Sequence, residues 1–168
     1  MTTQEPADLA GFVVLERLTP AQRTTVAGLA RPIEYQAGAQ LFEDGATADG
    51  VWLIRTGLVS LASSVPGRGL VEIQTLGAGD ILGWSWLVPP HHWHYTAIAK
   101  TAVQAFELDA VRLRALAAED PALGYPLALG LLESLLLRLQ ASRSRLLDLY
   151  GSPRNRSEGG DGGDRRER

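Results

Sequence analysis

Between Arg31 and Leu108 the chain consists of short β-prone runs that are separated by glycine-containing turn signals. The runs are 32–35, 39–43, 50–57, 58–64, 70–76, 94–101 and 102–108. The clearest turn is VPGRG, Val65 to Gly69, which stands between two alternating apolar runs and is typical of a hairpin tip. Seven or eight strands with such regular turns predict an antiparallel jelly roll or barrel rather than a parallel α/β sheet.

Helices are expected on both sides of these strands. Before them, Thr19 is a plausible N-cap and Pro20 a favoured first helical residue. The face that this helix is expected to bury contains Ala21, Val26, Leu29 and Ala30. After the strands, Asp109 is a candidate N-cap for a short helix that stops at Pro121.

A longer helix follows and is expected to end at Gly151, a good residue for a helix C-terminus. The predicted fold class is therefore α+β: an antiparallel β-roll, like a jelly-roll barrel, with an N-terminal helix and a C-terminal pair of short and long helices. We expect this domain to span residues 12–151. Residues 152–168 are polar, charged and glycine-rich, which predicts a disordered tail.

Within the long helix, one set of positions recurs at alternating spacings of three and four residues. The set is Leu132, Leu135, Leu139, Ser142, Leu146 and Leu149, with Leu129, Leu136 and Leu147 widening the apolar face. This spacing is typical of a helix that pairs along its length. The helix is interpreted either as the contact of a homodimer, which we favour, or as a lid on the chain's own barrel. A further protein partner is left open.

Composition limits the classes of protein that the chain can belong to. Its 168 residues are 45% hydrophobic and 21% charged, which fits one globular domain with a core. The absence of cysteine excludes disulfides and cysteine-ligated zinc. The net charge of −3 argues against nucleic-acid binding. The N-terminus lacks the features of a signal peptide, and Glu133 and Arg138 interrupt the most apolar run, so we expect a cytoplasmic protein without a membrane segment.

The stretch from Gly79 to Ala99 contains three of the four tryptophans, all three histidines and a Pro-Pro pair. Trp84, Trp86 and Trp93 could form an aromatic cage for a planar or cationic ligand, or could fill a former pocket; we favour the second interpretation. No acidic residue or cysteine lies near the histidines in a spacing that suits a metal, so no metal site is predicted. A pH-sensitive or anion-binding loop is the more plausible role for the histidines.

Three segments carry a resemblance to a known family. These are Tyr35 to Leu61, Leu76 to Gly83 and Thr96 to Asp109, in which glycines recur between apolar strands. Together with the flanking helices, they resemble the cyclic nucleotide-binding domain, the sensor module of catabolite-activator-type regulators, protein kinase A regulatory subunits and gated channels. The resemblance covers roughly residues 12–150 and implies a β-roll that senses a ligand. The chain also looks like a subgroup of stand-alone proteins in which an aromatic and Pro-Pro cassette replaces the usual charged one.

In this family a cassette between two strands holds the phosphate and ribose. Its usual form is a Gly-Glu pair that opens a short helix, then Arg followed by Ser or Thr and Ala. The resemblance carries the first part onto Gly83, Trp84, Ser85 and Trp86, and the second part onto Tyr95, Thr96 and Ala97. Trp84 then stands in place of Glu and Tyr95 in place of Arg. Loss of the charge-assisted bond to phosphate costs roughly 1.5–3 kcal/mol, so the chain is not expected to bind cyclic AMP in the usual way, although helix amides and Thr96 could hold an anion weakly.

The favoured function is a non-enzymatic sensor or adaptor that needs no cofactor, with a cyclic nucleotide or another small ligand left open. No paired-carboxylate, Ser-His-Asp or phosphate-loop signature supports an enzyme. The alternatives are a component of a catabolite-activator-type transcriptional regulator and a ligand-free accessory subunit of a larger assembly. In those regulators a helix-turn-helix follows the long helix, and the residues after Gly151 are too few to supply one, so direct DNA binding is not expected. If relatives' coupling is retained, residues 83–86 and 132–149 are the coupled parts.

Overall fold

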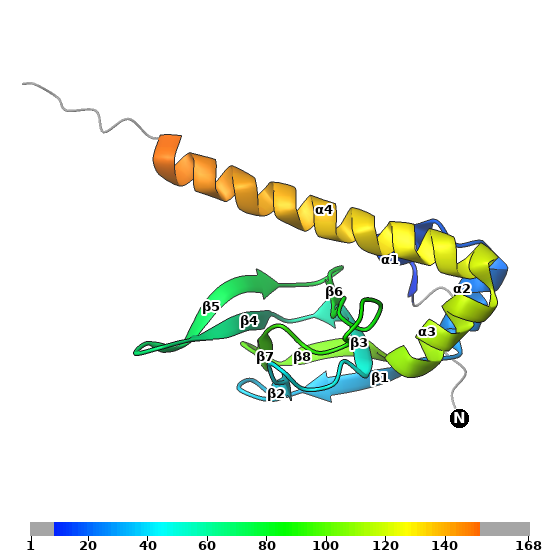
Figure 1. Cartoon of the computed structure of the whole chain (residues 1–168), viewed down its shortest axis with the longest axis horizontal. Helices are drawn as coiled ribbons and strands as arrows, with labels where there is room; N and C mark the ends of the chain where they lie inside the picture. Colours follow the sequence, from blue (N-terminus) through cyan, green and yellow to red (C-terminus); the bar gives the residue numbers. More distant parts are fainter. Residues whose placement is uncertain (1–8, 152–168) are drawn as a thin grey trace, which may run out of the picture. The chain divides into compact units, whose positions relative to one another are not determined.

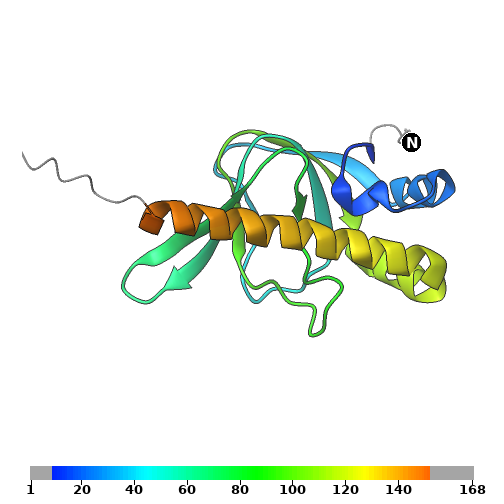
Figure 2. The ribbon, with the colours of Figure 1, turned by 90° about the horizontal axis from the view of Figure 1, so that it is seen from above.

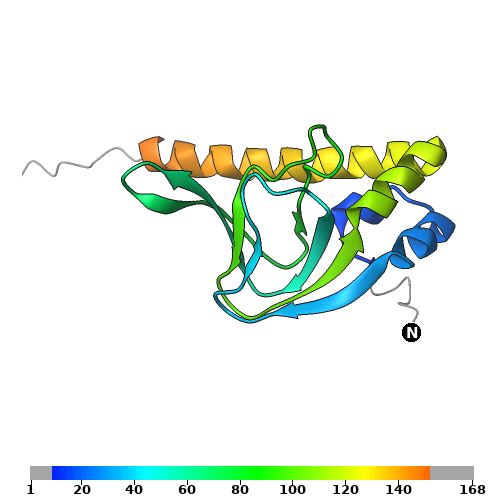
Figure 3. The same cartoon turned by 60° about the horizontal axis from the view of Figure 1, so that its bottom comes forward.

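Eight short strands form two antiparallel sheets in the computed structural model of the chain, which describes residues 9–151. The first sheet has the strand order β1-β8-β3-β6 and the second has the order β2-β7-β4-β5. The strands are β1 (Ala30–Tyr35), β2 (Gln40–Phe42), β3 (Gly50–Thr56), β4 (Val59–Val65), β5 (Gly69–Leu76), β6 (Ile81–Leu82), β7 (Thr96–Ala99) and β8 (Val103–Asp109). Figure 3 shows the resulting β-roll, so the predicted α+β class with an antiparallel roll is confirmed.

The predicted turns and strands largely coincide with the observed ones. The hairpin of β4 and β5 turns at Pro66 to Arg68, as the VPGRG motif predicts, and the Arg68 N–H donates to the Val65 carbonyl at 3.0 Å. The sequence prediction missed β6, which has only two residues and pairs with β3 through Trp52 and Leu53. Such a short strand carries no alternation that a sequence pattern could detect.

Four helices are described: α1 (Val13–Glu16), α2 (Pro20–Ala27), α3 (Ala110–Glu119) and α4 (Pro121–Gly151). Thr19 caps α2 in a capping box with Gln22, and Asp109 caps α3 by accepting from the Arg112 N–H at 2.9 Å, which confirms both predicted N-caps. Figures 1 and 3 show α1, α2 and α3 at one end of the roll. The predicted face of α2 is partly wrong, because Ala21 is exposed and Ala27 is buried in its place.

Two units of the chain are described separately, Met1–Leu136 and Leu137–Arg168. Within the first unit, side chains on one face of β3 pack against the helices. Val51 and Leu53 lie with Val14, Leu113 and Leu127 around a residual space of only about 10 Å³, which leaves no room for a ligand. The predicted domain of 12–151 stays a prediction, and the predicted tail of 152–168 lies outside the described residues.

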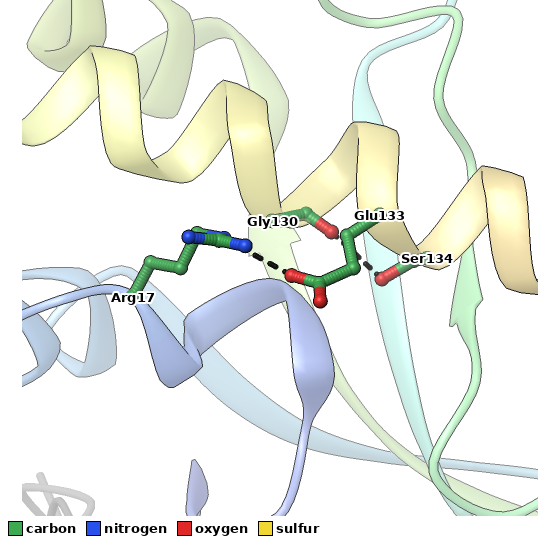
Figure 4. Close-up of polar contacts among 4 residues, drawn as sticks. All are labelled: Arg17, Gly130, Glu133 and Ser134. Atoms are coloured by element: carbon green, nitrogen blue, oxygen red, sulfur yellow. Dashed lines mark hydrogen bonds and ion pairs between the residues drawn. The ribbon is translucent and has the colours of Figure 1, made fainter.

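The beginning of α4 belongs to the core of the first unit, where Leu123, Leu127 and Leu131 are buried. Gly130 permits close contact with α1, because a Cβ at this position would lie 2.3 Å from the Val14 carbonyl oxygen. Arg17 Nε donates to Glu133 Oε2 at 3.0 Å, and Ser134 Oγ donates to the Gly130 carbonyl at 2.9 Å (Figure 4).

One helix in the described part of the chain, Pro121–Tyr150, is long and apolar enough to cross a membrane by length and composition, with a mean hydropathy of 1.4 in its most apolar window. Part of this apolar character comes from the three leucines that the core buries. The prediction of a cytoplasmic protein without a membrane segment stays a prediction.

The predicted seam of α4 is largely exposed. In the first unit Leu132 is exposed, while Leu135 is half-buried against the core. In the second unit, Leu139, Leu146 and Leu149 are 65%, 56% and 77% exposed. Ser142 is half-buried, and its hydroxyl donates to the Arg138 carbonyl at 3.0 Å within the helix.

Candidate functional site

The segment predicted to hold a ligand is the loop between β6 and β7, which extends from the roll (Figure 2). Gly83 follows β6 directly, and Thr96 and Ala97 begin β7, where they pair with Ala62 and Leu61 of β4. The two halves of the predicted cassette are therefore attached to different sheets, as the motif order requires.

The short helix expected at residues 83–86 is absent among the described residues, and this prediction is wrong. Trp84 to Leu87 form a single turn, in which the Leu87 N–H donates to the Trp84 carbonyl at 3.2 Å. One turn leaves no row of aligned amides, so the loop lacks the helix N-terminus that would attract an anion.

Trp93 lies between the two sheets and is 3% exposed. Its ring stacks on Phe42 of β2, with centroids 4.0 Å apart and planes at 15°, and lies 5.8 Å from the ring of Trp52 of β3. Phe42 and Trp52 are themselves 5.4 Å apart. These three rings, which we name the aromatic cluster, occupy the space between the sheets on the side of the β6–β7 loop.

The three tryptophans of the loop do not act together. Trp84 is half-buried and stacks on His94, with centroids 5.1 Å apart. Trp86 is 1% exposed and lies among the residues that join the first sheet to the helices, so it does not fill the roll. The expectation of one plug made of three indoles is therefore wrong, and Trp93 alone joins the aromatic cluster.

The remaining cassette residues are uncharged and largely enclosed. Ser85, Thr96 and Ala97 are buried, and Tyr95 is half-buried against the core. The Thr96 hydroxyl accepts from the Asp44 N–H at 3.2 Å, so it is engaged within the protein. Trp84 and Tyr95 are thus half-buried aromatic side chains. That they replace the Glu and Arg of the family's pattern stays a prediction.

Main-chain hydrogen bonds attach the loop to residues 45–48. The Gly45 N–H donates to the Trp93 carbonyl at 2.9 Å, and the Trp93 N–H donates to the Ala46 carbonyl at 2.8 Å. The Ala48 N–H donates to the His91 carbonyl at 2.8 Å. These bonds fix the backbone position of Trp93 independently of its ring.

His91 adopts a left-handed backbone conformation with a φ of 58°, and its Nδ1 is buried without a hydrogen-bond partner among residues 9–151. Within the same residues no group of three or more His, Cys, Asp or Glu side chains is arranged to hold a metal ion.

A tyrosine supports the aromatic cluster from β1. Trp52 Nε1 donates to the Tyr35 hydroxyl at 3.1 Å. Burial raises the pKa of the Tyr35 phenol above its ordinary value, so this group is neutral at physiological pH. Tyr35 therefore contacts the cluster as a neutral phenol.

Sequence reasoning missed Phe42 and Trp52 as parts of this site. Trp52 is the tryptophan outside the crowded loop, and the sequence pattern around it predicts a β-strand and no contact with a ligand. Alternation along β3 was the available signal, since it puts Trp52 and Ile54 on the face opposite Val51 and Leu53. Nothing in the sequence pattern indicates that Trp93 reaches them.

Trp86 also connects the loop to a helix. Arg114 Nη1 of α3 donates to the Trp86 carbonyl at 2.9 Å, while the indole Nε1 is buried without a partner among the described residues. A displacement of the loop would therefore disturb both the α3 contact and the apolar packing around Trp86.

Gly83 is expected to be needed for the Trp93 position. Its φ is 96°, and a Cβ there would lie 3.0 Å from the Trp93 ring and 3.3 Å from the Gly50 carbonyl oxygen. Gly79 has a φ of 89° but no atom within 4 Å of such a Cβ, which makes Gly79→Ala a matched control for backbone strain. We expect Gly79→Ala to lower the free energy of unfolding by about 1–3 kcal/mol, and Gly83→Ala to lower it by at least about 1 kcal/mol more. Urea unfolding monitored by tryptophan fluorescence checks this; equal losses would contradict the contact.

Known proteins agree with this architecture. The family model for the cyclic nucleotide-binding domain matches residues 32–120. The HTH-type transcriptional regulator Cmr of Mycobacterium tuberculosis is 33% identical over 137 residues, which are 80% of this chain and 54% of that protein, so the chain spans about half the length of this relative.

A putative cyclic nucleotide-binding protein from Geobacter metallireducens has a TM-score of 0.75 at 26% identity, over 81% of this chain and 98% of that one. A cyclic nucleotide-binding domain from Methylobacillus flagellatus has a TM-score of 0.70 at 24% identity, over 84% of this chain and 85% of that one. The chain therefore belongs to the cyclic nucleotide-binding domain family, whose members are generally non-catalytic sensor domains.

Proposed function

We propose that this chain is a non-enzymatic sensor or adaptor whose β-roll does not hold cyclic AMP in the usual way. The observation that carries the proposal is the position of Trp93, stacked on Phe42 and close to Trp52 between the two sheets. A side chain of the protein occupies space that a ring-bearing ligand would need there. Because the Trp93 ring occupies the interior of the β-roll, we favour a protein that binds a different ligand from the family's usual one or no ligand.

The loss of charge supports the same proposal. Trp84 and Tyr95 replace the acid and the cation of the family's pattern, and the loop has one turn in place of a helix. A phosphate there would lose a charge-assisted bond of roughly 1.5–3 kcal/mol, which corresponds to about one to two orders of magnitude in affinity. The aromatic cluster and the missing charges are thus two separate obstacles to an ordinary nucleotide.

We propose that a conformational change in the β6–β7 loop is transmitted from the β-roll to the helices. Trp86 is the element that links the loop to α3, by its carbonyl and by its buried ring. A ligand or partner that shifts the loop would alter the packing at α3 and at the start of α4. This is a population shift between two packings, and it requires a ligand that prefers one of them.

Nucleotide binding is expected to return when the charged pair is introduced and the space occupied by the Trp93 ring is opened. We expect the triple variant Trp84→Glu, Tyr95→Arg, Trp93→Ala to bind cyclic AMP at least about 10-fold more tightly than the wild type, because it regains a cation and frees space. Trp93→Ala alone and the double variant Trp84→Glu, Tyr95→Arg separate the steric effect from the charge effect. Isothermal titration calorimetry with cyclic AMP and cyclic GMP provides the measurement, and circular dichroism verifies that each variant is folded. Wild-type affinity equal to that of the triple variant would refute the proposal.

Helix α4 is proposed to form a homodimer through its exposed seam. Leu139 and Leu146 lie seven residues apart on that seam and are largely exposed. We expect the double variant Leu139→Glu, Leu146→Glu to be a monomer in sedimentation velocity at a concentration where the wild type is a dimer. Ser144→Glu, an exposed position on the opposite side of the helix, is the control and should remain dimeric. A monomeric wild type, or a dimeric double variant, would exclude this interface.

A second candidate function is a component of a transcriptional regulator. The observation that favours it is the 33% identity to the regulator Cmr over 80% of this chain. If the chain acts on DNA through a partner, a gel shift on promoter DNA is expected only when the partner is present, and it should weaken as salt is raised. A salt-dependent shift by this chain alone would instead show direct DNA binding.

A further inference from the structure

A second cavity lies at the start of α3, away from the β6–β7 loop. Its volume is about 400 Å³, within the range of small-molecule sites. Leu29 is half-buried and supplies apolar surface, Leu108 is buried, and five charged side chains supply the rest of its wall: Arg31, Asp49, Glu107, Asp109 and Arg112. All these residues belong to the first unit.

Two of the five charges neutralise each other within the protein, and a third, Asp109, is engaged in a helix cap. Arg31 Nε donates to Glu107 Oε2 at 2.6 Å, across the pairing of β1 with β8. The Glu107 side chain is 17% exposed and that of Arg31 is 71% exposed, so the carboxylate lies deep and the guanidinium at the rim. Asp109 Oδ1 is engaged by the Arg112 N–H as the cap of α3.

The side chains of Asp49 and Arg112 remain. Among residues 9–151 neither makes a side-chain hydrogen bond or an ion pair, and they are not paired with each other although both line the same cavity. Their main chains are fixed at the start of α3, since the Ala110 N–H donates to the Asp49 carbonyl at 3.1 Å and the Arg112 N–H donates to Asp109. The cavity is therefore bordered by one exposed carboxylate and one exposed guanidinium, whose main chains are fixed and whose side chains have no partner among the described residues.

We propose that this cavity binds a small zwitterion with an aliphatic body. The cationic group of the ligand would face Asp49, its anionic group would face Arg112, and its hydrocarbon would contact Leu29. A simple anion would satisfy Arg112 but would meet Asp49 and Asp109, and a simple cation would leave Arg112 unpaired. Free amino acids and short peptides both have this chemistry, and they differ in the distance between their charges.

Binding by the full-length protein is measured by calorimetry with four probes. These are L-leucine, L-leucinamide, which lacks the anionic group, 4-methylpentanoate, which lacks the cationic group, and L-leucylglycine, whose charges lie farther apart. We expect a zwitterion to bind at least about 10-fold more tightly than either singly charged probe, since each charge contributes a charge-assisted contact. Preference for L-leucine identifies an amino acid as the ligand class, and preference for L-leucylglycine identifies a peptide.

Two variants assign the charges. Asp49→Asn should reduce L-leucine binding to the level of 4-methylpentanoate, and Arg112→Gln should reduce it to the level of L-leucinamide. Glu16→Gln and Arg68→Gln, at exposed positions that do not line the cavity, are the matched controls and should bind as the wild type does. The proposal is overturned if no zwitterion gives saturable binding, if 4-methylpentanoate binds as tightly as L-leucine, or if both cavity variants retain wild-type affinity. These outcomes do not depend on whether the roll binds a nucleotide.

Discussion

The contact on which the candidate site depends is the cluster in which Trp93 stacks on Phe42 of one sheet and lies tilted beside Trp52 of the other. An aromatic side chain buries 150–250 Å² when it is enclosed, so such a cluster outweighs any single hydrogen bond of the loop. It brings a ring of the β6–β7 loop together with one ring from each sheet, so the loop and both sheets depend on the same contact.

Much of the fold could be predicted because it depends on local chemistry. Glycine-containing turns separate alternating runs, and Thr19 and Asp109 are side chains that cap a helix wherever they precede one. The prediction failed at β6 and at residues 83–86, because segments of two and four residues carry no periodicity. It also failed to predict where the indole rings of the three tryptophans lie. Residue type shows that the tryptophans need apolar surroundings, but the partners of Trp93 come from β2 and β3 and that of Trp86 from α3, which only the tertiary arrangement brings near.

The two ends of the β6–β7 loop differ in what they contact. Near β6, Trp86 contacts the helices through its ring and its carbonyl. Near β7, Trp93 contacts the sheets. The loop contacts the helices through Trp86 and the sheets through Trp93, so few conformations of the loop keep both contacts. A rearrangement of the loop therefore breaks at least one of them. Among the described residues the indole Nε1 of Trp86 has no hydrogen-bond partner. The end of the loop near β6 therefore loses fewer hydrogen bonds when it moves than the end near β7 does.

The three main-chain bonds between residues 45–48 and 91–93 have an evolutionary consequence. They involve no side-chain atom, so the course of the loop is set by a framework that is indifferent to which side chains it carries. Substitutions at positions such as Trp84 and Tyr95 can then exchange a charged surface for an aromatic one while the backbone is preserved. The loop of this chain can therefore change the chemistry of its surface at such positions without a change in its hydrogen-bonded course.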